Sequence, residues 1–214
     1  TTLFRSANIP EKSEIKEEKE PLIYIYNTHQ TEEYNNYNVC DAASLLTKKL
    51  NDSGIKSIYE EQSMKVFLEA NNLKYYNSYR ASRNYMNEAL KNNPTLKYFF
   101  DIHRDSVSKE KSTVTVDKKN YAKVLMIVGL DNPGSQNNLN NANRLNQIIS
   151  SKAAGISRGI ITKGGKGVNG IYNQDLSENV FLIEVGGKDN TKEEVENTIE
   201  VIYESILEYI RGII

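Results

Sequence analysis

The chain has 214 residues, enough for one domain with a sizeable core, and 38% of them are hydrophobic. Its 27 lysine and arginine residues nearly balance 28 aspartate and glutamate residues, for a net charge of −1. This balance argues against binding to nucleic acid or anionic membranes through charge, so we expect no nucleic-acid partner. The single cysteine, Cys40, excludes an intrachain disulfide and a cysteine-based zinc cluster.

Residues 1–20 are predicted to be a disordered charged tail. Most positions from 11 to 20 are charged and none is aromatic, a composition that buries too little apolar surface to fold. The sequence has no run of about 18 apolar residues and therefore predicts no transmembrane helix. It also lacks a signal peptide and an initiating methionine, which we interpret as the sign of a trimmed or processed chain.

After Pro21, predicted strands alternate with predicted helices. Residues 22–26 form a short apolar run, typical of a strand that is covered on both faces. Apolar residues then recur at helical spacing over residues 38–50. The later predictions, in chain order, are a strand at 55–59, a helix at 75–90, strands at 96–102 and 124–130, a helix at 136–153, a strand at 159–162, a Gly-rich loop at 164–170, a strand at 180–185 and a helix at 192–210.

This alternation predicts an α/β fold with a mostly parallel twisted sheet flanked by helices. Ligands of such sheets bind outside the carboxyl ends of the strands, so we expect the functional residues there. The Gly-rich loop is predicted to form a wall of the cleft. Some of the fourteen tyrosines could stack on sugars, although most are expected to be core or amphipathic surface residues.

The only two histidines, His29 and His103, each lie just past the end of a predicted strand. Imidazole is the commonest zinc ligand, and a catalytic zinc takes three protein ligands and one open position. Glu32 and Glu33 follow His29 on the same predicted loop, and the sequence alone leaves open which of them is the third ligand. An ordinary hydrogen-bonded role is the alternative for each histidine, but their shared placement favours a metal site.

Glu184 interrupts the apolar run of residues 181–185. A carboxylate in a buried strand is costly unless it is paired or functional, and burial raises its pKa toward the range of a general base. We therefore interpret Glu184 as the catalytic base. The alternative is an ion pair with Arg104 or Arg80.

Three charged residues around His103 complete the candidate site. Asp101 lies on the same side of the predicted strand as His103, and either Asp101 or Asp105 could accept a ring N–H and fix the histidine tautomer. Arg104 could pair with Asp105 or bind a substrate carboxylate. Both alternatives stay open for each of these residues.

Four motifs together resemble the stage II sporulation protein P (SpoIIP) family, which is related to the zinc N-acetylmuramoyl-L-alanine amidases. The motifs are YNTHQTE at 26–32, DIHRD at 101–105, LIEVGG at 182–187 and YNQDLS at 172–177, and the likeness spans about residues 21–210. The resemblance implies a zinc-amidase-like catalytic domain over residues 21–214. It also implies that His29, Glu32 and His103 bind Zn2+ and that Glu184 acts on the substrate.

The resemblance further implies a zinc-dependent peptidoglycan hydrolase of sporulation engulfment, which cuts the amide between muramic acid and the stem peptide. Some members are credited with endopeptidase action as well. Partners implied are peptidoglycan, the SpoIID transglycosylase and the SpoIIM membrane scaffold. The expected location is extracytoplasmic, at the sporulation septum, with an N-terminal membrane anchor that this sequence does not contain.

Two other functions remain open from the sequence. The first is a catalytically inactive scaffold that binds peptidoglycan, and the second is a metal-dependent peptidase. A divalent ion other than zinc could occupy the site, although the ligand types favour zinc.

Overall fold

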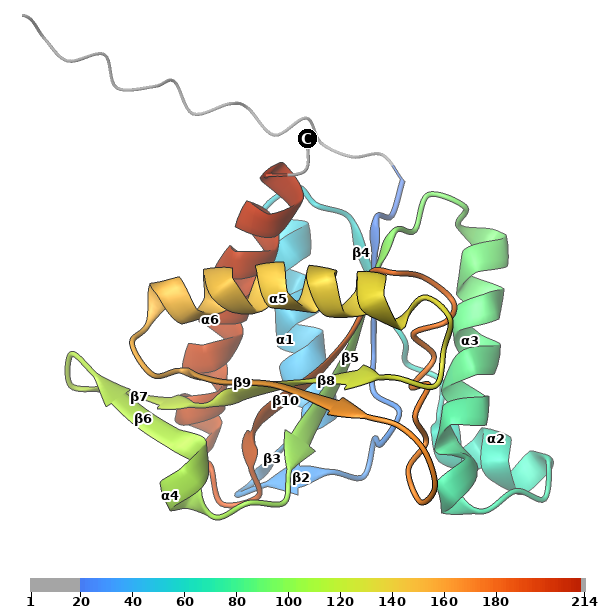
Figure 1. The fold of residues 1–214 in the computed structure, drawn as a ribbon, viewed down its shortest axis with the longest axis horizontal. Helices are drawn as coiled ribbons and strands as arrows, with labels where there is room; N and C mark the ends of the chain where they lie inside the picture. The colour runs from blue at the N-terminus through green and yellow to red at the C-terminus, as the bar shows by residue number, and fades with distance from the viewer. Residues whose placement is uncertain (1–19, 213–214) are drawn as a thin grey trace, which may run out of the picture.

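A computed structural model describes residues 20–212, so the predicted charged tail lies almost wholly outside the described residues. The central sheet has six strands in the order β4-β1-β5-β10-β8-β9 (Figure 1). Their bounds are Ser57–Tyr59 (β4), Ile23–Tyr26 (β1), Tyr98–Asp105 (β5), Val180–Gly187 (β10), Val124–Gly129 (β8) and Ser157–Lys163 (β9).

The predicted α/β fold with a mostly parallel sheet is confirmed. Strands β4, β1, β5 and β10 run parallel to one another, and β9 is parallel to β8. The β8–β10 pairing is antiparallel. The carboxyl ends of β1, β5 and β10 therefore meet at one edge of the sheet, where a site is expected.

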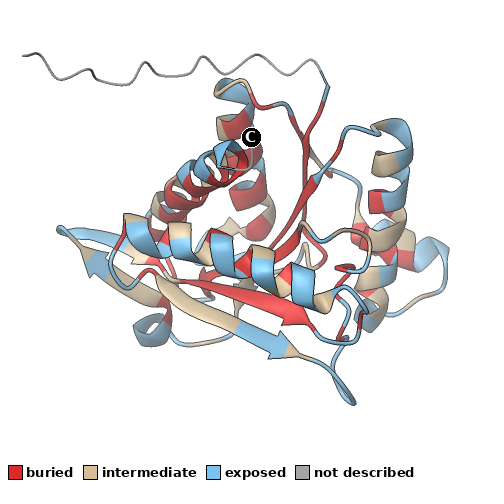
Figure 2. Ribbon diagram, turned by 45° about the horizontal axis from the view of Figure 1, so that its top comes forward, coloured by how far each residue is buried: buried red, intermediate tan, exposed pale blue. Residues whose placement is uncertain are grey.

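Three helices cover one face of the sheet, and they are α1 (Val39–Asp52), α5 (Ser135–Lys152) and α6 (Lys192–Arg211) (Figure 1). Their inward faces and the sheet form the main core, which is red in Figure 2. The opposite face carries α3 (Ser78–Asn92), whose buried Met86 packs on Tyr24, Tyr26 and Phe99 from β1 and β5. The part of this face beyond α3 is more open. Ile161 of β9 is 45% exposed there, and residues of β8 and β10 line a pocket.

The helix termini follow from local capping chemistry. The Asn38 side chain accepts a hydrogen bond from the Asp41 N–H, and the Asp41 side chain accepts one from the Asn38 N–H, so a capping box begins α1. Thr191 and Glu194 form the same arrangement at the start of α6. The predicted helix at 75–90 starts as a 3-10 turn, η1 (Tyr75–Asn77), before α3.

The sequence analysis missed the short elements. These are α2 (Met64–Ala70), α4 (Lys109–Ser112) and the hairpins β2–β3 (Glu33–Tyr34, Tyr37–Asn38) and β6–β7 (Thr113–Val116, Lys119–Ala122). The β6–β7 turn places Asp117 and Lys118 at φ values of 49° and 67°. Such turns usually carry glycine or asparagine, so an Asp-Lys pair gave no hairpin signal.

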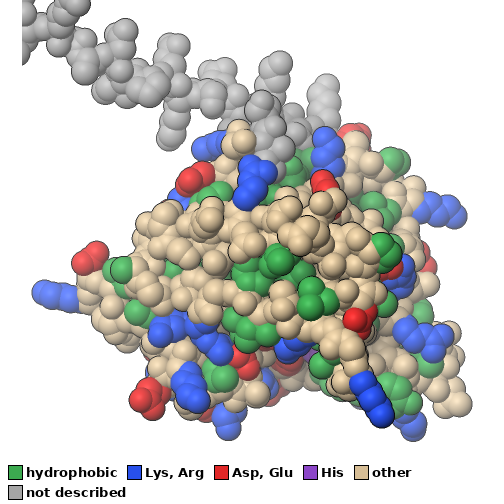
Figure 3. Space-filling view, viewed as in Figure 1, with side chains coloured by type: hydrophobic (Ala, Val, Ile, Leu, Met, Phe, Trp, Pro, Cys, Tyr) green, Lys and Arg blue, Asp and Glu red, His purple; other side chains and the backbone are tan. Residues whose placement is uncertain are grey.

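In the view of Figure 3, charged side chains lie mostly toward the outline, uncharged and hydrophobic ones occupy the centre, and no histidine is visible. Within residues 20–212, no helix combines the length and the apolar character that a membrane crossing requires.

Candidate metal centre and the pocket around it

The turn after β1 carries His29 and Glu32, and the buried Asn27 side chain holds this turn in place. Its Nδ2 donates to the carbonyls of Val39 (3.1 Å) and Ile102 (2.6 Å). The Glu32 N–H donates to the His29 carbonyl at 3.0 Å, which closes the turn. His29 and Glu32 consequently lie beside the end of β5.

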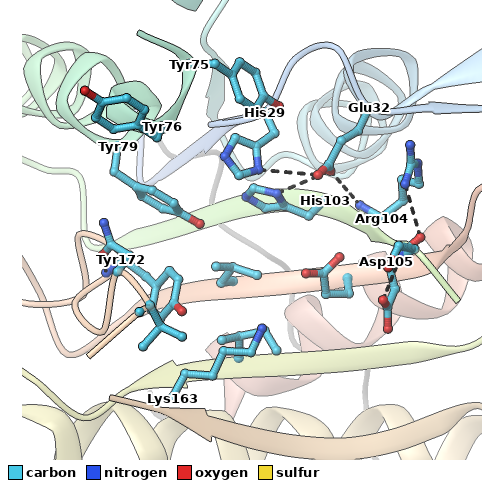
Figure 4. Close-up of a pocket in the computed structure, with 17 residues that line it drawn as sticks. His29, Glu32, Tyr75, Tyr76, Tyr79, His103, Arg104, Asp105, Lys163 and Tyr172 are labelled. Atoms are coloured by element: carbon cyan, nitrogen blue, oxygen red, sulfur yellow. Dashed lines mark hydrogen bonds and ion pairs between the residues drawn. The ribbon is translucent and has the colours of Figure 1, made fainter. Parts of the chain in front are cut away.

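Glu32 lies between the two imidazoles (Figure 4). Its carboxylate oxygens are 3.4 Å from His29 Nδ1 and 3.3 Å from His103 Nδ1, and it accepts a hydrogen bond of 3.0 Å from the Arg104 N–H. One candidate ligand atom from each of His29, Glu32 and His103 lies within 4.8 Å of the others. Glu33 is exposed in β2 instead, because its strand neighbour Tyr34 is buried. Between the two glutamates, the structure brings Glu32 into the cluster.

His103 lies within β5, which corrects the expectation that it follows the end of the strand. It is nearly fully buried, and its Nε2 is 2.9 Å from Asp101 Oδ1, an ion-pair distance without the alignment of a hydrogen bond. Asp101 is itself fully buried and accepts hydrogen bonds from the Thr28 N–H (2.8 Å) and hydroxyl (2.7 Å). Asp101 is thereby fixed behind the ring of His103.

The electrostatics of this cluster favour a cation. Burial alone would lower the pKa of His103, but the Asp101 and Glu32 carboxylates raise it well above its ordinary value. Burial would raise the pKa of Glu32, but contacts with His103 and His29 and the Arg104 N–H hold it far below its ordinary value. The buried carboxylate of Asp101 and the half-buried carboxylate of Glu32 thus stabilise positive charge between them. Two imidazoles and one carboxylate with a supporting carboxylate fit a catalytic zinc.

Glu184 lies beside this cluster because β10 pairs with β5 in a register that places Glu184 next to His103. Burial raises the pKa of Glu184; Glu32 and Asp105 act in the same direction, while His103 and Lys163 oppose them. Its Oε2 is buried without a hydrogen-bond partner. No ion pair joins Glu184 to an arginine or lysine within residues 20–212, which disfavours the ion-pair interpretation.

The side chains of Arg104 and Asp105 do not pair with each other, although both line the pocket. The Arg104 guanidinium donates to the carbonyls of Glu33 (2.8 Å) and Asp105 (3.4 Å). The Asp105 carboxylate pairs with Arg158 at 2.7 Å and contacts neither histidine. Of the two candidate partners for a histidine ring, the structure places only Asp101 in contact.

These groups line a pocket of about 730 Å³ (Figure 4). One wall consists of Tyr75, Tyr76, Tyr79 and Tyr172, here called the tyrosine wall. Tyr75 stacks on His29 with ring centroids 5.2 Å apart, and Tyr79 meets His29 edge-on at 5.6 Å. The predicted Gly-rich loop lines the pocket through residues 167–169, as expected.

The sequence analysis did not identify the tyrosine wall or Lys163. Three of the wall's members cluster at positions 75, 76 and 79, a signal that was available but not specific. Lys163 ends the edge strand β9 and also lines the pocket. Neither the wall tyrosines nor Lys163 was assigned a role by a catalytic or ligand-binding motif, so only the fold shows that they surround the pocket.

Comparison with protein families links the chain to a sporulation protein. A family model described as stage II sporulation protein P (SpoIIP) matches residues 4–206. The stage II sporulation protein P of Bacillus subtilis (strain 168) is 34% identical over 190 residues, which cover 82% of this chain and 47% of that protein. The chain therefore spans about half the length of this relative.

Solved structures share the fold at low sequence identity. The CwlD amidase of Clostridioides difficile, solved in complex with the GerS lipoprotein, superimposes with a TM-score of 0.56 and 17% identity over 89% of this chain and 99% of that chain. The N-acetylmuramoyl-L-alanine amidase AmiC2 of Nostoc punctiforme superimposes with a TM-score of 0.52 and 12% identity, over 89% of this chain and 97% of that chain. These likenesses establish a zinc-amidase-like fold.

Proposed function

Because the chain belongs to the stage II sporulation protein P family, we propose that it is a zinc-dependent peptidoglycan hydrolase of sporulation. The bond cut would be the amide between muramic acid and the stem peptide, as in an N-acetylmuramoyl-L-alanine amidase. The amidase-like fold supports this proposal. We propose residues 21–214 as the catalytic domain.

The observation that carries the proposal is the His29–Glu32–His103 cluster with Glu184 on the adjacent strand, whose buried Oε2 has no hydrogen-bond partner. These three residues would hold the zinc ion. When bound, zinc acts as a Lewis acid that acidifies water and polarises a carbonyl group.

The protein side chains supply proton transfer and positioning. Glu184 takes a proton from the attacking water and delivers it to the nitrogen of the leaving amine, a role that its raised pKa suits. Asp101 holds the His103 ring so that Nδ1 faces Glu32. The tyrosine wall offers flat apolar surfaces against which a sugar ring can stack.

The test is mass spectrometry of peptidoglycan digested by the zinc-loaded protein. We expect free stem peptides from the wild type, none after chelation, and a loss of at least about 100-fold in rate for Glu184→Gln with zinc binding retained. Glu32→Gln should lose zinc, whereas the matched control Glu33→Gln should keep both zinc and activity. Full turnover by Glu184→Gln would refute its role as base.

The same digest separates the rival functions. Cleavage within peptide cross-links would show endopeptidase action. Binding to peptidoglycan that survives chelation, with no new amine ends, would indicate a scaffold without hydrolysis. The buried, unpartnered Oε2 of Glu184 disfavours the scaffold, because such an atom destabilises the fold and a scaffold would have no use for it.

Family membership also supports proposals on partners and location. We propose action at the sporulation septum, outside the cytoplasm, on peptidoglycan and together with the SpoIID transglycosylase and the SpoIIM scaffold. Co-purification from sporulating cells tests these associations, and failure to recover either protein after cross-linking would count against them.

A further inference from the structure

Lys163 enters the pocket from the side opposite the metal ligands (Figure 4). It is the last residue of β9, the edge strand, and the sheet order β5-β10-β8-β9 places the strand of Glu184 between His103 and Lys163. Neighbouring strands are about 4.8 Å apart, so β9 lies roughly 10 Å across the sheet from β10. If the bond being cut lies at Glu184, a more distant part of the same substrate would contact Lys163.

The ammonium group of Lys163 is in contact with no counter-ion within residues 20–212, although its charge acts on Glu184 from across the pocket. The other cations near the pocket are already engaged: Arg104 by two backbone carbonyls and Arg158 by Asp105. No ion pair or hydrogen bond is formed by the ammonium group of Lys163, although the side chain is half-buried. A pocket-lining cation with no counter-ion in contact is suited to bind an anionic group of a ligand.

The floor between Glu184 and Lys163 is suited to an extended chain. Ile127 and Leu182, from β8 and β10, line the pocket there, and Ile161 lies beside Ile127 on β9. No helix among the described elements buries Ile161, which is 45% exposed. An extended peptide advances about 3.3 Å per residue, so a few residues span the distance from the cut amide to Lys163.

We propose that Lys163 binds a carboxylate of the stem peptide a few residues from the cut amide, and that it thereby selects substrates in which this carboxylate is free. The inference rests on the proposed function and adds a specificity determinant to it. An ammonium group recognises a carboxylate by charge and hydrogen bonding, and amidation of the carboxylate removes the charge.

The experiment compares two muramyl peptides that differ only in whether one stem-peptide carboxylate is free or amidated. With the zinc-loaded wild type, we expect kcat/KM to favour the free acid. Lys163→Met should reduce this preference about tenfold, the effect of losing one charge-assisted contact of about 1.4 kcal/mol. Lys163→Arg should restore most of it. Lys166→Met, on the neighbouring loop outside the pocket lining, should keep the wild-type preference.

Two results would overturn the proposal. An equal loss of kcat/KM on both peptides in Lys163→Met, with a shifted pH profile, would mean that Lys163 acts on Glu184 rather than on substrate. A wild type without preference between the peptides would also refute it.

Measuring how the two peptides bind to the Glu184→Gln variant distinguishes a failure of the Lys163 proposal from a failure of the proposed function. If calorimetry shows that the zinc-loaded variant binds both peptides equally, only the proposed role of Lys163 is refuted. If it binds neither peptide and the wild type releases no product, both proposals fall.

Discussion

Replacing Asp101 by asparagine should remove one charge behind His103 while leaving the surrounding hydrogen bonds in place. Asp101 is fully buried, and asparagine has the same shape. The amide oxygen can still accept from the Thr28 N–H, and the amide nitrogen can donate to the Thr28 hydroxyl, which lies 2.9 Å from the Ser82 hydroxyl and can donate to it. The change therefore isolates the effect of the Asp101 charge on the metal centre.

The expected loss is the difference between a charged and a neutral contact. Hydrogen bonds to charged groups contribute about 1.5–3 kcal/mol and neutral ones about 0.5–1.5, and we take the difference of about 1–2 kcal/mol as the scale for losing the Asp101 charge beside His103. This difference weakens zinc binding about 5- to 30-fold, within reach of a competition titration against a chromophoric chelator.

Asp105→Asn is the matched control for Asp101→Asn, because it neutralises the other aspartate two residues from His103 on the same strand. Asp105 pairs with Arg158 and contacts no ligand, so we expect a change in zinc affinity of less than about threefold. Equal weakening by the two substitutions would mean that the contact between Asp101 and His103 is not what tunes the metal centre.

Three further predictions concern stability. Zinc at about 100 times its Kd should add about 2.7 kcal/mol to the free energy of unfolding, and identical melting curves with and without chelator would contradict a native zinc site. Phe100→Ala, which removes a fully buried ring stacked 5.2 Å from Phe181, should cost about 3–5 kcal/mol in urea unfolding without changing the zinc Kd of the folded protein. Glu194→Gln should lower the free energy of unfolding by about 1–2 kcal/mol above pH 4.5. Burial would raise the pKa of Glu194, but hydrogen bonds from Thr191 and Asn190 and the contact with Lys109 lower it below its ordinary 4.5. A lowered pKa stabilises the fold only while the group is ionised, so the difference between wild type and variant should shrink as the pH falls below 4.5; a gap that persists at pH 2 would point to packing instead.

The sequence predicted the sheet and most of the candidate site because the relevant signals are local. The apolar strands and the polar residues that follow them determine which edge gathers His29 and His103. Glu184 was identifiable because a carboxylate breaks an otherwise apolar strand. The family comparisons then confirmed the resemblance carried by four short motifs.

The remaining features depend on contacts between distant segments. The choice between Glu32 and Glu33 depends on the buried Tyr34, whose hydroxyl donates to the Val185 carbonyl 151 residues along the chain. The true length of β5 depends on its pairing with β10, which carries the strand through His103 to Asp105. No periodicity in one segment reports such pairings.

Strand β10 separates two kinds of residue by simple alternation. Phe181, Ile183 and Val185 point into the helix-covered core, whereas Leu182 and Glu184 face the pocket. In a saturation scan of residues 181–185, substitutions at the odd positions should mainly lower the amount of folded protein, and substitutions at Glu184 should mainly abolish activity. Substitutions can thus change activity and stability largely independently within these five consecutive residues of β10.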